Sequence, residues 1–272
     1  MPEGPEIRRV ADRLNRVLAG RPLADVWFAF AELKPAEIQL LSHRVTHVDS
    51  WGKALLTHFD NGQVLYSHNQ LYGRWRIERR EQPLSSTRSL RAALATSTHV
   101  ARLYSASSIS LWDEHDLPTH PFLSRLGPDL LTHDVQTDAL VERLTSRRFA
   151  GRQIGSLLLD QGLVAGIGNY LRSEILFYAG LREHWRPNEL STRAITRLAD
   201  MIRQITVQAW REAGVTNTPE WRAPLQAQGF RRSVWRHAVF NRAGEPCFAC
   251  GTLVEKRPCN SRRLYYCPHC QS

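Results

Sequence analysis

The first residues of the chain carry groups that could perform nucleophilic catalysis. Pro2 follows Met1 and precedes Glu3. Removal of Met1 during synthesis would leave Pro2 as a free N-terminus with a secondary amine. An α-amine has a reference pKa of about 7.7–8.0, so a sizeable fraction is unprotonated at neutral pH. Such an amine can attack a carbonyl-like carbon and form a Schiff base, and Glu3 can supply the acid or base that this reaction needs.

Four cysteines near the C-terminus have the spacing of a structural zinc site. Cys247 and Cys250 form one pair, Cys267 and Cys270 form the other, and 16 residues separate the pairs. Four thiolates complete a tetrahedral Zn²⁺ site and leave no position for water, which argues against a zinc-dependent hydrolase. Disulfides are disfavoured because we expect a cytoplasmic protein and because Cys259 would remain unpaired.

Two further segments could contact phosphate groups. The turn at residues 260–263 lies between the cysteine pairs, and its arginines could present a rigid cation to a phosphate. Gly166 and Gly168 would let the backbone approach a ligand closely, and Asn169 could cap the helix that follows. Taken alone, each segment also fits a plain alternative, namely a basic turn in solvent and an ordinary helical hairpin.

The net charge of the chain points to a polyanionic partner. The formal charge is +10, and residues 228–272 hold +6 of it, with eight Lys or Arg against two Asp or Glu. Solubility alone does not require such clustering, so the basic C-terminal segment is expected to take part in binding the polyanion. Only three of the 36 basic residues are lysines, so Lys53 suggests a site that requires a compact, titratable amine.

The pattern of apolar residues predicts the elements that must position these groups. Residues 5–19 have the periodicity of an amphipathic helix. We expect short strands at 25–30, 54–59, 63–67, 72–78, 100–104 and 107–112, with a hairpin turn at Asp60–Gly62. Helical periodicity begins after residue 117, and the helices expected there cover 135–146, 153–161, 169–179 and 191–212. Residues 213–228 are predicted to form a loop, followed by zinc-hairpin strands at 252–255 and 264–266.

These elements predict three domains, at residues 1–125, 126–227 and 228–272. No apolar run approaches the roughly 20 residues that span a bilayer. The start of the chain has no signal-peptide pattern, so we expect a cytoplasmic protein that does not bind membranes.

Taken together, these motifs resemble one family of DNA repair enzymes. The run PEGPE at Pro2–Glu6, the Gly-Ile-Gly-Asn turn ending at Asn169 and the four-cysteine hairpin with Arg262 resemble the formamidopyrimidine-DNA glycosylase/endonuclease VIII family. The resemblance covers essentially the whole chain. Within the family, the run SHNQLYGRWRI at Ser67–Ile77 is similar to the endonuclease VIII branch, whereas the formamidopyrimidine branch typically has Met-Ser-Gly there.

The resemblance implies an α+β protein with DNA bound between two domains. The fold would be an N-terminal β-sandwich with a leading helix, then a helix–two-turns–helix domain that ends in a four-cysteine zinc-finger β-hairpin. The implied reaction is excision of oxidised pyrimidines followed by strand cleavage through β,δ-elimination. The partner would be double-stranded DNA with an oxidised pyrimidine or an abasic site, bound by a monomer. Binding to DNA would associate the cytoplasmic protein with the nucleoid.

Catalytic roles follow by position from the same resemblance. Pro2 would be the Schiff-base nucleophile at the sugar C1′ and Glu3 the proton donor. Lys53 would serve the β-elimination and Arg262 the δ-elimination. The resemblance also matches Glu6, and Glu174 in the later helix, to supporting acidic residues.

DNA-contacting roles follow for five further residues. Gln70, Arg125 and Asn169 match positions that contact DNA. Gln70, Leu71 and Tyr72 would together fill the space left when the damaged nucleotide is flipped out of the duplex. An alternative interpretation of Leu71 is a strand residue that faces the core.

Two other functions fit parts of the sequence. A non-catalytic zinc-ribbon protein that binds damaged DNA would explain the charge and the cysteines but would give Pro2 and Glu3 no role. A glycosylase of the same family that acts on oxidised purines would need the same catalytic residues, and the run at Ser67–Ile77 argues against it.

Overall fold

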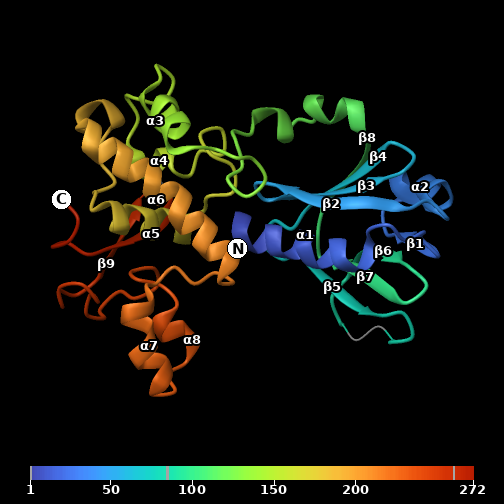
Figure 1. Ribbon diagram of the computed structural model, residues 1–272. Coiled ribbons are helices and arrows are strands. Elements are labelled where there is room, and N and C mark those ends of the chain that lie inside the picture. The colour runs from blue at the N-terminus through green and yellow to red at the C-terminus, as the bar shows by residue number, and fades with distance from the viewer. Residues whose placement is uncertain (1, 84–85, 260) are drawn as a thin grey trace. The chain divides into compact units, whose positions relative to one another are not determined.

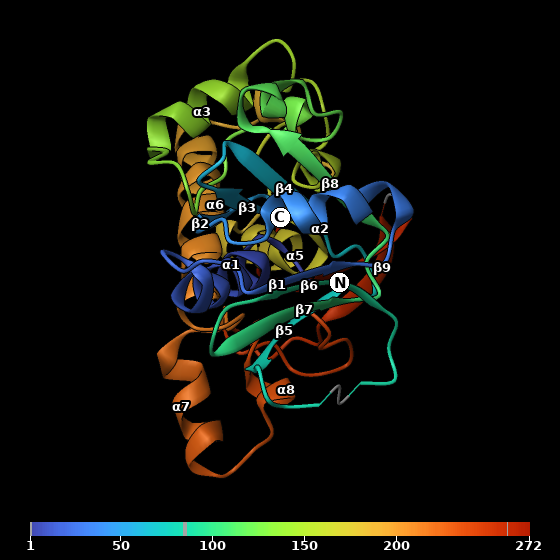
Figure 2. The same cartoon turned by 90° about the vertical axis from the view of Figure 1, so that its right-hand side faces the viewer.

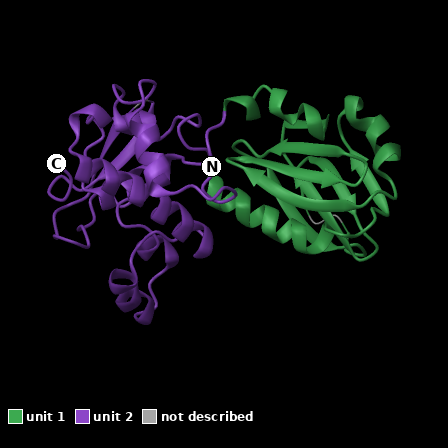
Figure 3. Cartoon of the chain, turned by 45° about the horizontal axis from the view of Figure 1, so that its top comes forward, with its two compact units in different colours: residues 1–125 green, residues 126–272 purple. Residues whose placement is uncertain are grey.

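The chain folds into two compact units. Unit 1 comprises residues 1–125 and unit 2 comprises residues 126–272 (Figure 3). The structure, a computed structural model, describes residues 2–83, 86–259 and 261–272. Met1, whose removal we expect, and Asn260 at the predicted hairpin tip lie outside the described residues. The separation of residues 228–272 from 126–227 as a domain stays a prediction.

Unit 1 begins with the helix that the apolar periodicity predicts. Helix α1 (Gly4–Leu18) buries Ile7, Leu14 and Leu18, each no more than 1% exposed. Burial of one such side chain contributes about 2 kcal/mol, so this face holds the helix against the sheets. The helix expected over residues 5–19 is therefore confirmed.

The rest of unit 1 is built from two antiparallel sheets. One sheet has the strand order β1-β6-β7-β5 and the other the order β2-β3-β4-β8. Figure 2 shows them as two layers. The strands are β1 (Asp25–Phe28), β2 (Val45–Trp51), β3 (Ala54–Phe59), β4 (Gln63–His68), β5 (Arg74–Arg79), β6 (Leu90–Ala95), β7 (His99–Tyr104) and β8 (Ser108–Asp113). Shorter helical elements are η1 (Ala31–Leu33), α2 (Lys34–Leu40), η2 (Glu114–Thr119) and η3 (Leu123–Arg125).

A single apolar core fills the space between these sheets. Phe28 and Leu94 from the first sheet meet Leu55 and Leu65 from the second, and each is at most 2% exposed. Because both sheets contribute inward-facing residues to one core, the unit is a β-sandwich. The hairpin predicted around Asp60–Gly62 joins β3 to β4.

Unit 2 is helical and ends in a β-hairpin. Helix α6 (Thr192–Arg211) buries Leu198 and Ile202 against the core, and Ser191 caps its start by accepting a hydrogen bond from the Ala194 N–H at 3.3 Å. The elements are α3 (Thr137–Thr145), α4 (Ile154–Leu157), α5 (Asn169–Ala179), η4 (Pro187–Glu189), α6 (Thr192–Arg211), α7 (Pro219–Ala227), α8 (Arg232–Trp235), β9 (Glu255–Cys259) and β10 (Arg262–Tyr266) (Figure 1).

Three details of unit 2 differ from the sequence predictions. Residues 213–228 are not all loop, because Thr218 and Pro219 begin helix α7. Pro224 lies inside α7, and proline disfavours the interior of a helix, so the sequence favours a loop there. The helix expected over 153–161 is a single turn, α4, and the first hairpin strand occupies Glu255–Cys259 rather than 252–255.

The predicted fold class is confirmed. The protein is α+β, with a leading helix and two sheets, then a helical region and a four-cysteine hairpin. Among the residues that the structure describes, no helix combines the length and the apolar character needed to cross a membrane.

Candidate functional site

Glu3 is held at the start of helix α1, directly after Pro2. Glu3 is the N-cap residue, and Glu6 Oε2 accepts a hydrogen bond from the Glu3 N–H at 3.0 Å, which forms a capping box. The positive end of the helix dipole favours carboxylates at this position. Glu3 is only 4% exposed, and Pro2 is half-buried. The PEGPE run therefore fixes the backbone on which the Pro2 nitrogen sits.

Two contacts orient helix α1 along strand β2. Asn15 Oδ1 accepts a hydrogen bond from the Val48 N–H at 2.8 Å, and Arg8 forms an ion pair with Asp49 at 2.6 Å. Residue numbers decrease along the helix as they increase along the strand, so α1 and β2 run in opposite directions. The helix N-terminus consequently lies toward the end of the sheet where β2 turns into β3.

Lys53 lies in that turn. Gly52 and Lys53 connect the two strands, and Gly52 has a φ of 61°, which a side chain at this position would strain. Ala54 pairs with His68, so Lys53, which precedes β3, and Asn69, which follows β4, lie at the same end of these neighbouring strands. Burial, and secondly the charge of Lys53, lowers the pKa of His68. Lys53 therefore lies near His68, the last residue of the strand that leads into residues 70–72.

Residues 69–73 form a tight loop that exposes two large apolar side chains. The Gly73 N–H donates to the Asn69 carbonyl oxygen at 2.7 Å, and Gln70 has a φ of 49°. Leu71 is 59% exposed and Tyr72 is 71% exposed. The alternative of a core-facing Leu71 is therefore wrong, because β5 begins only at residue 74. We call residues 69–73 the insertion loop, after the role that we propose for it below.

Three side chains outside the insertion loop hold it in place. His68 Nδ1 accepts a hydrogen bond from the Gln70 N–H at 3.0 Å, and the Ser107 hydroxyl donates to Gln70 Oε1 at 2.5 Å. Arg88 donates to the Tyr72 carbonyl oxygen at 2.9 Å. His68 can accept only when Nδ1 carries no proton, so its lowered pKa preserves this bond. Sequence reasoning missed all three contacts. Those of Ser107 and Arg88 join segments that are distant in the sequence, and the local contact of His68 depends on the shape of the loop.

Unit 2 brings Asn169 and the arginine turn together. Asn169 Nδ2 donates to the Arg263 carbonyl oxygen at 2.8 Å, next to the exposed Arg262. The fully buried Arg172 donates to Asn169 Oδ1 at 2.8 Å and so fixes the amide. The predicted capping role of Asn169 is wrong, because Gly168 is the N-cap and Asn169 is the first helical residue.

The four predicted cysteines form one cluster. The Cys247 and Cys270 Sγ atoms are 3.9 Å apart, the Cys250 and Cys267 Sγ atoms are 3.5 Å apart, and all four lie within 4.8 Å of one another. Tetrahedral zinc with Zn–S bonds of about 2.3 Å needs S–S separations of about 3.8 Å, so the donor set fits such an ion. Cys259 lies outside the cluster and packs against the core of unit 2.

Glu174 links helix α5 to the segment that leads into the cysteine cluster. It is fully buried, and its carboxylate accepts hydrogen bonds from the N–H groups of Ala238, Val239 and Phe240 at 2.8–2.9 Å. A buried carboxylate is stable only with such donors. The family resemblance matches Glu174 to a supporting acidic residue, but only the fold shows that it binds the backbone of residues 238–240.

The predicted residues thus fall into separate local groups. In unit 1, Pro2, Glu3, Lys53 and the insertion loop lie toward one end of the sheet β2-β3-β4-β8. Arg125 ends η3 and is exposed. In unit 2, Asn169 lies beside Arg262, at the start of β10.

Comparisons with known proteins identify the class of enzyme to which this arrangement belongs. Residues 1–108 match the formamidopyrimidine-DNA glycosylase N-terminal domain, and residues 126–219 match the formamidopyrimidine-DNA glycosylase H2TH domain. The chain belongs to this family of DNA glycosylases that are also lyases at abasic sites, which confirms the predicted family and enzyme class. A non-catalytic zinc-ribbon protein is correspondingly not supported.

Individual proteins show how similar the chain is to known members of the family. The chain is 46% identical to Endonuclease 8 of Escherichia coli O17:K52:H18 and 45% identical to Endonuclease 8 of Shigella sonnei, in each case over 271 residues and 100% of both chains. Among solved structures, a complex of the Lactococcus lactis formamidopyrimidine-DNA glycosylase with an abasic-site DNA has a TM-score of 0.82 at 20% identity, covering 99% of each chain. A complex of MutM with DNA containing carbocyclic 8-oxo-G has a TM-score of 0.81 at 21% identity, covering 100% of each chain. These structures share the fold.

Proposed function

We propose that the protein excises oxidised pyrimidines from double-stranded DNA and then cleaves the strand by β,δ-elimination. The observation that carries this proposal is Pro2, directly before a buried Glu3 whose backbone is fixed by a capping box. The preference for pyrimidine over purine lesions is what the resemblance of Ser67–Ile77 to the endonuclease VIII branch implies, and the full-length identity of 45–46% to proteins named Endonuclease 8 agrees with that branch.

The proposed first step is attack of the Pro2 nitrogen on the sugar C1′. The bond from C1′ to the damaged base breaks, and the base leaves with a proton. Glu3 donates a proton to the sugar ring oxygen, so the ring opens and a C1′=N⁺ Schiff base remains. The Schiff base makes the C2′ hydrogen acidic, which prepares the strand for elimination.

The proposed eliminations then use two cations. Loss of the C2′ proton expels the 3′ phosphate, and we assign Lys53 to this β-elimination. A second elimination expels the 5′ phosphate, and we assign Arg262 to it. A guanidinium or ammonium group at a leaving phosphate offsets the charge that develops there.

The remaining assignments concern DNA and metal binding. We propose that Leu71 and Tyr72 occupy the gap left by the flipped nucleotide, because exposed apolar side chains on a braced loop suit that task. Gln70, Arg125 and Asn169 would contact the DNA. A structural Zn²⁺ held by the four thiolates would brace the hairpin that carries Arg262. We also propose that the protein is a monomer and that it is located in the cytoplasm, bound to DNA.

The test is excision from matched duplexes. Identical duplexes would carry one thymine glycol, one 8-oxoguanine or one abasic site, and products would be separated under denaturing conditions. We expect rapid cleavage of the thymine glycol duplex and slower cleavage of the 8-oxoguanine duplex, with phosphate at both ends of the gap. Faster cleavage of the 8-oxoguanine duplex would instead assign the enzyme to oxidised purines.

A further inference from the structure

Helices α7 and α8 form an exposed pair at residues 219–236, which we call the helical pair (Figure 1). Neither helix contains a buried residue, although a helix in a globular protein usually buries an apolar stripe. Phe230 is 47% exposed and Val234 is 41% exposed. The end of the helical pair where α7 connects to α8, around Phe230 and Val234, is therefore uncovered, and we call it the far end.

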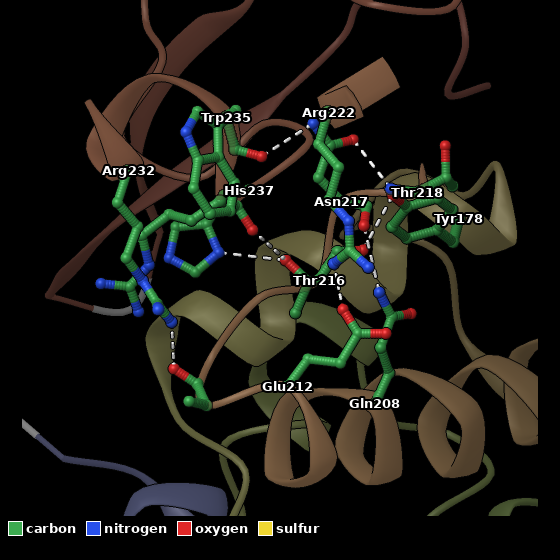
Figure 4. Close-up of polar contacts among 12 residues, drawn as sticks. Tyr178, Gln208, Glu212, Thr216, Asn217, Thr218, Arg222, Arg232, Trp235 and His237 are labelled. Carbon is green, nitrogen blue, oxygen red and sulfur yellow. Dashed lines mark hydrogen bonds and ion pairs between the residues drawn. The ribbon is translucent and has the colours of Figure 1, made fainter. Parts of the chain in front are cut away.

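Polar contacts hold the base of the helical pair together, and Figure 4 shows them. The Thr216 N–H donates to the Arg236 carbonyl oxygen at 2.9 Å, and Asn217 Nδ2 donates to the Trp235 carbonyl oxygen at 2.9 Å. Thr216 and Asn217 are fully buried. The two chain segments that enter and leave the pair are thus joined directly to each other.

This joint is anchored in the core of unit 2. The Thr216 hydroxyl donates its proton to the Glu174 carboxylate. The same hydroxyl must therefore accept from His237 Nδ1, 3.0 Å away (Figure 4). Tyr178 donates to the Thr216 carbonyl oxygen at 3.0 Å. Burial lowers the pKa of His237 to about 3, so this histidine stays neutral and the network keeps one proton arrangement.

An aromatic stack fixes the first turn of α7 as well. The Trp221 ring stacks on Tyr178 of α5 at 6.3 Å and on Phe248 of the cysteine segment at 5.9 Å, with interplanar angles of 14° and 19°. The helical pair is consequently a braced projection whose far end meets no apolar cover within the described residues.

The charge of the helical pair suggests what covers that end. It contains four arginines and one glutamate. Arg222, Arg232 and Arg236 have partners within unit 2. Arg231, beside Phe230, is exposed, and no ion pair or hydrogen bond of its guanidinium is found among the residues that the structure describes.

We propose that the far end of the helical pair docks on duplex DNA outside the damaged nucleotide. Arg231 binds a backbone phosphate, and Phe230 and Val234 pack on the sugars beside it. A cation next to exposed apolar groups matches the alternation of phosphate and sugar along a strand. The inference rests on the proposed function, since that function makes duplex DNA the partner.

The test compares the F230S/R231A double variant with wild type on duplexes of increasing length that carry a central stable abasic-site analogue. We expect wild-type affinity to increase with length over a range where the variant shows no increase. On long duplexes the variant should bind about three- to tenfold more weakly, and its slope of log K against log salt should be shallower by about 0.9. Both replaced side chains are exposed, so the fold and borohydride trapping on an abasic-site duplex should be unchanged.

The matched control is Arg193→Ala, which removes an exposed arginine from helix α6. An equal loss in this control would show a general charge effect and overturn the inference. So would wild-type affinity and salt slope in the double variant, with trapping intact in both proteins. If wild type neither bound duplexes nor formed trapped adducts, the proposed function would fail too. Loss of binding to polyglutamate with DNA binding unchanged would point to an acidic protein partner instead.

Discussion

The substitution Gly73→Ala tests whether the insertion loop must keep its observed shape. A Cβ atom at residue 73 would lie 2.5 Å from the Asn69 carbonyl oxygen and 2.6 Å from the Asn69 Cα atom. Ordinary carbon–oxygen contacts lie at about 3.3–3.6 Å, so the two backbone segments must separate by about 1 Å. Because both neighbours are backbone atoms, no side-chain rotation can relieve the overlap.

The expected cost follows from this geometry. Overpacking of this kind costs about 1–3 kcal/mol. The loop can relax in the free enzyme by weakening the 2.7 Å bond from the Gly73 N–H to the Asn69 oxygen, so only part of the cost should reduce stability. The rest should appear on DNA binding, because the proposed role of the loop requires Leu71 and Tyr72 to return to their positions. If about two thirds of the cost appears on binding, it amounts to about 0.7–2 kcal/mol, and at about 1.4 kcal/mol per tenfold the affinity should fall about 3- to 30-fold.

The assay is fluorescence anisotropy with a duplex that carries a stable abasic-site analogue. Thermal unfolding should show a Tm lower by only a few degrees, and borohydride trapping at saturating enzyme should be retained. Gly151→Ala is the matched control, because a Cβ atom there meets nothing within 4 Å. Affinity of Gly73→Ala within twofold of wild type would refute the reasoning.

Three further predictions concern single residues. Arg262→Ala should stop strand cleavage after β-elimination, so the product would keep an unsaturated sugar at its 3′ end; 3′-phosphate at the wild-type rate would remove Arg262 from that step. Cys250→Ser should lose zinc, measured by metal analysis, and lose DNA binding and local stability, whereas full binding without zinc would contradict a structural role. For His237, burial holds the pKa near 3 against 6.5 in the unfolded chain, so its contribution to stability is complete above about pH 6.5 and declines as the pH falls toward 3. His237→Gln should therefore show a weaker fall of Tm with acid than wild type does, and an unchanged acid profile would show that His237 is not the group responsible.

The elements that the sequence predicts well are those with local signals. Helix α1 has both apolar periodicity and a capping box at its start, and the hairpin between β3 and β4 has a turn sequence that permits few other structures. Strand β6 was not predicted, because Ala92, Ala93 and Ala95 favour helix by propensity. The residues become a strand because β1 and β7 pair with them on both sides.

The residues of the candidate site also divide into those with a local signal in the sequence and those that depend on tertiary contacts. The types and spacing of Pro2, Glu3 and the cysteines pointed to their chemistry without a fold, since each motif is local. The bracing of the insertion loop by Ser107 and the burial of Arg172 depend on contacts between distant segments. No periodicity or spacing in the sequence encodes such contacts.

The most direct test of the proposed mechanism is to locate the covalent bond. Protein with Met1 removed would be trapped with borohydride on a duplex that carries one thymine glycol, then digested, and the modified peptide identified by mass spectrometry. We predict one adduct, on the Pro2 nitrogen, and no adduct with protein that retains Met1. An adduct on Lys53, or equal trapping of the Met1-retaining protein, would contradict the assignment of Pro2 as the nucleophile.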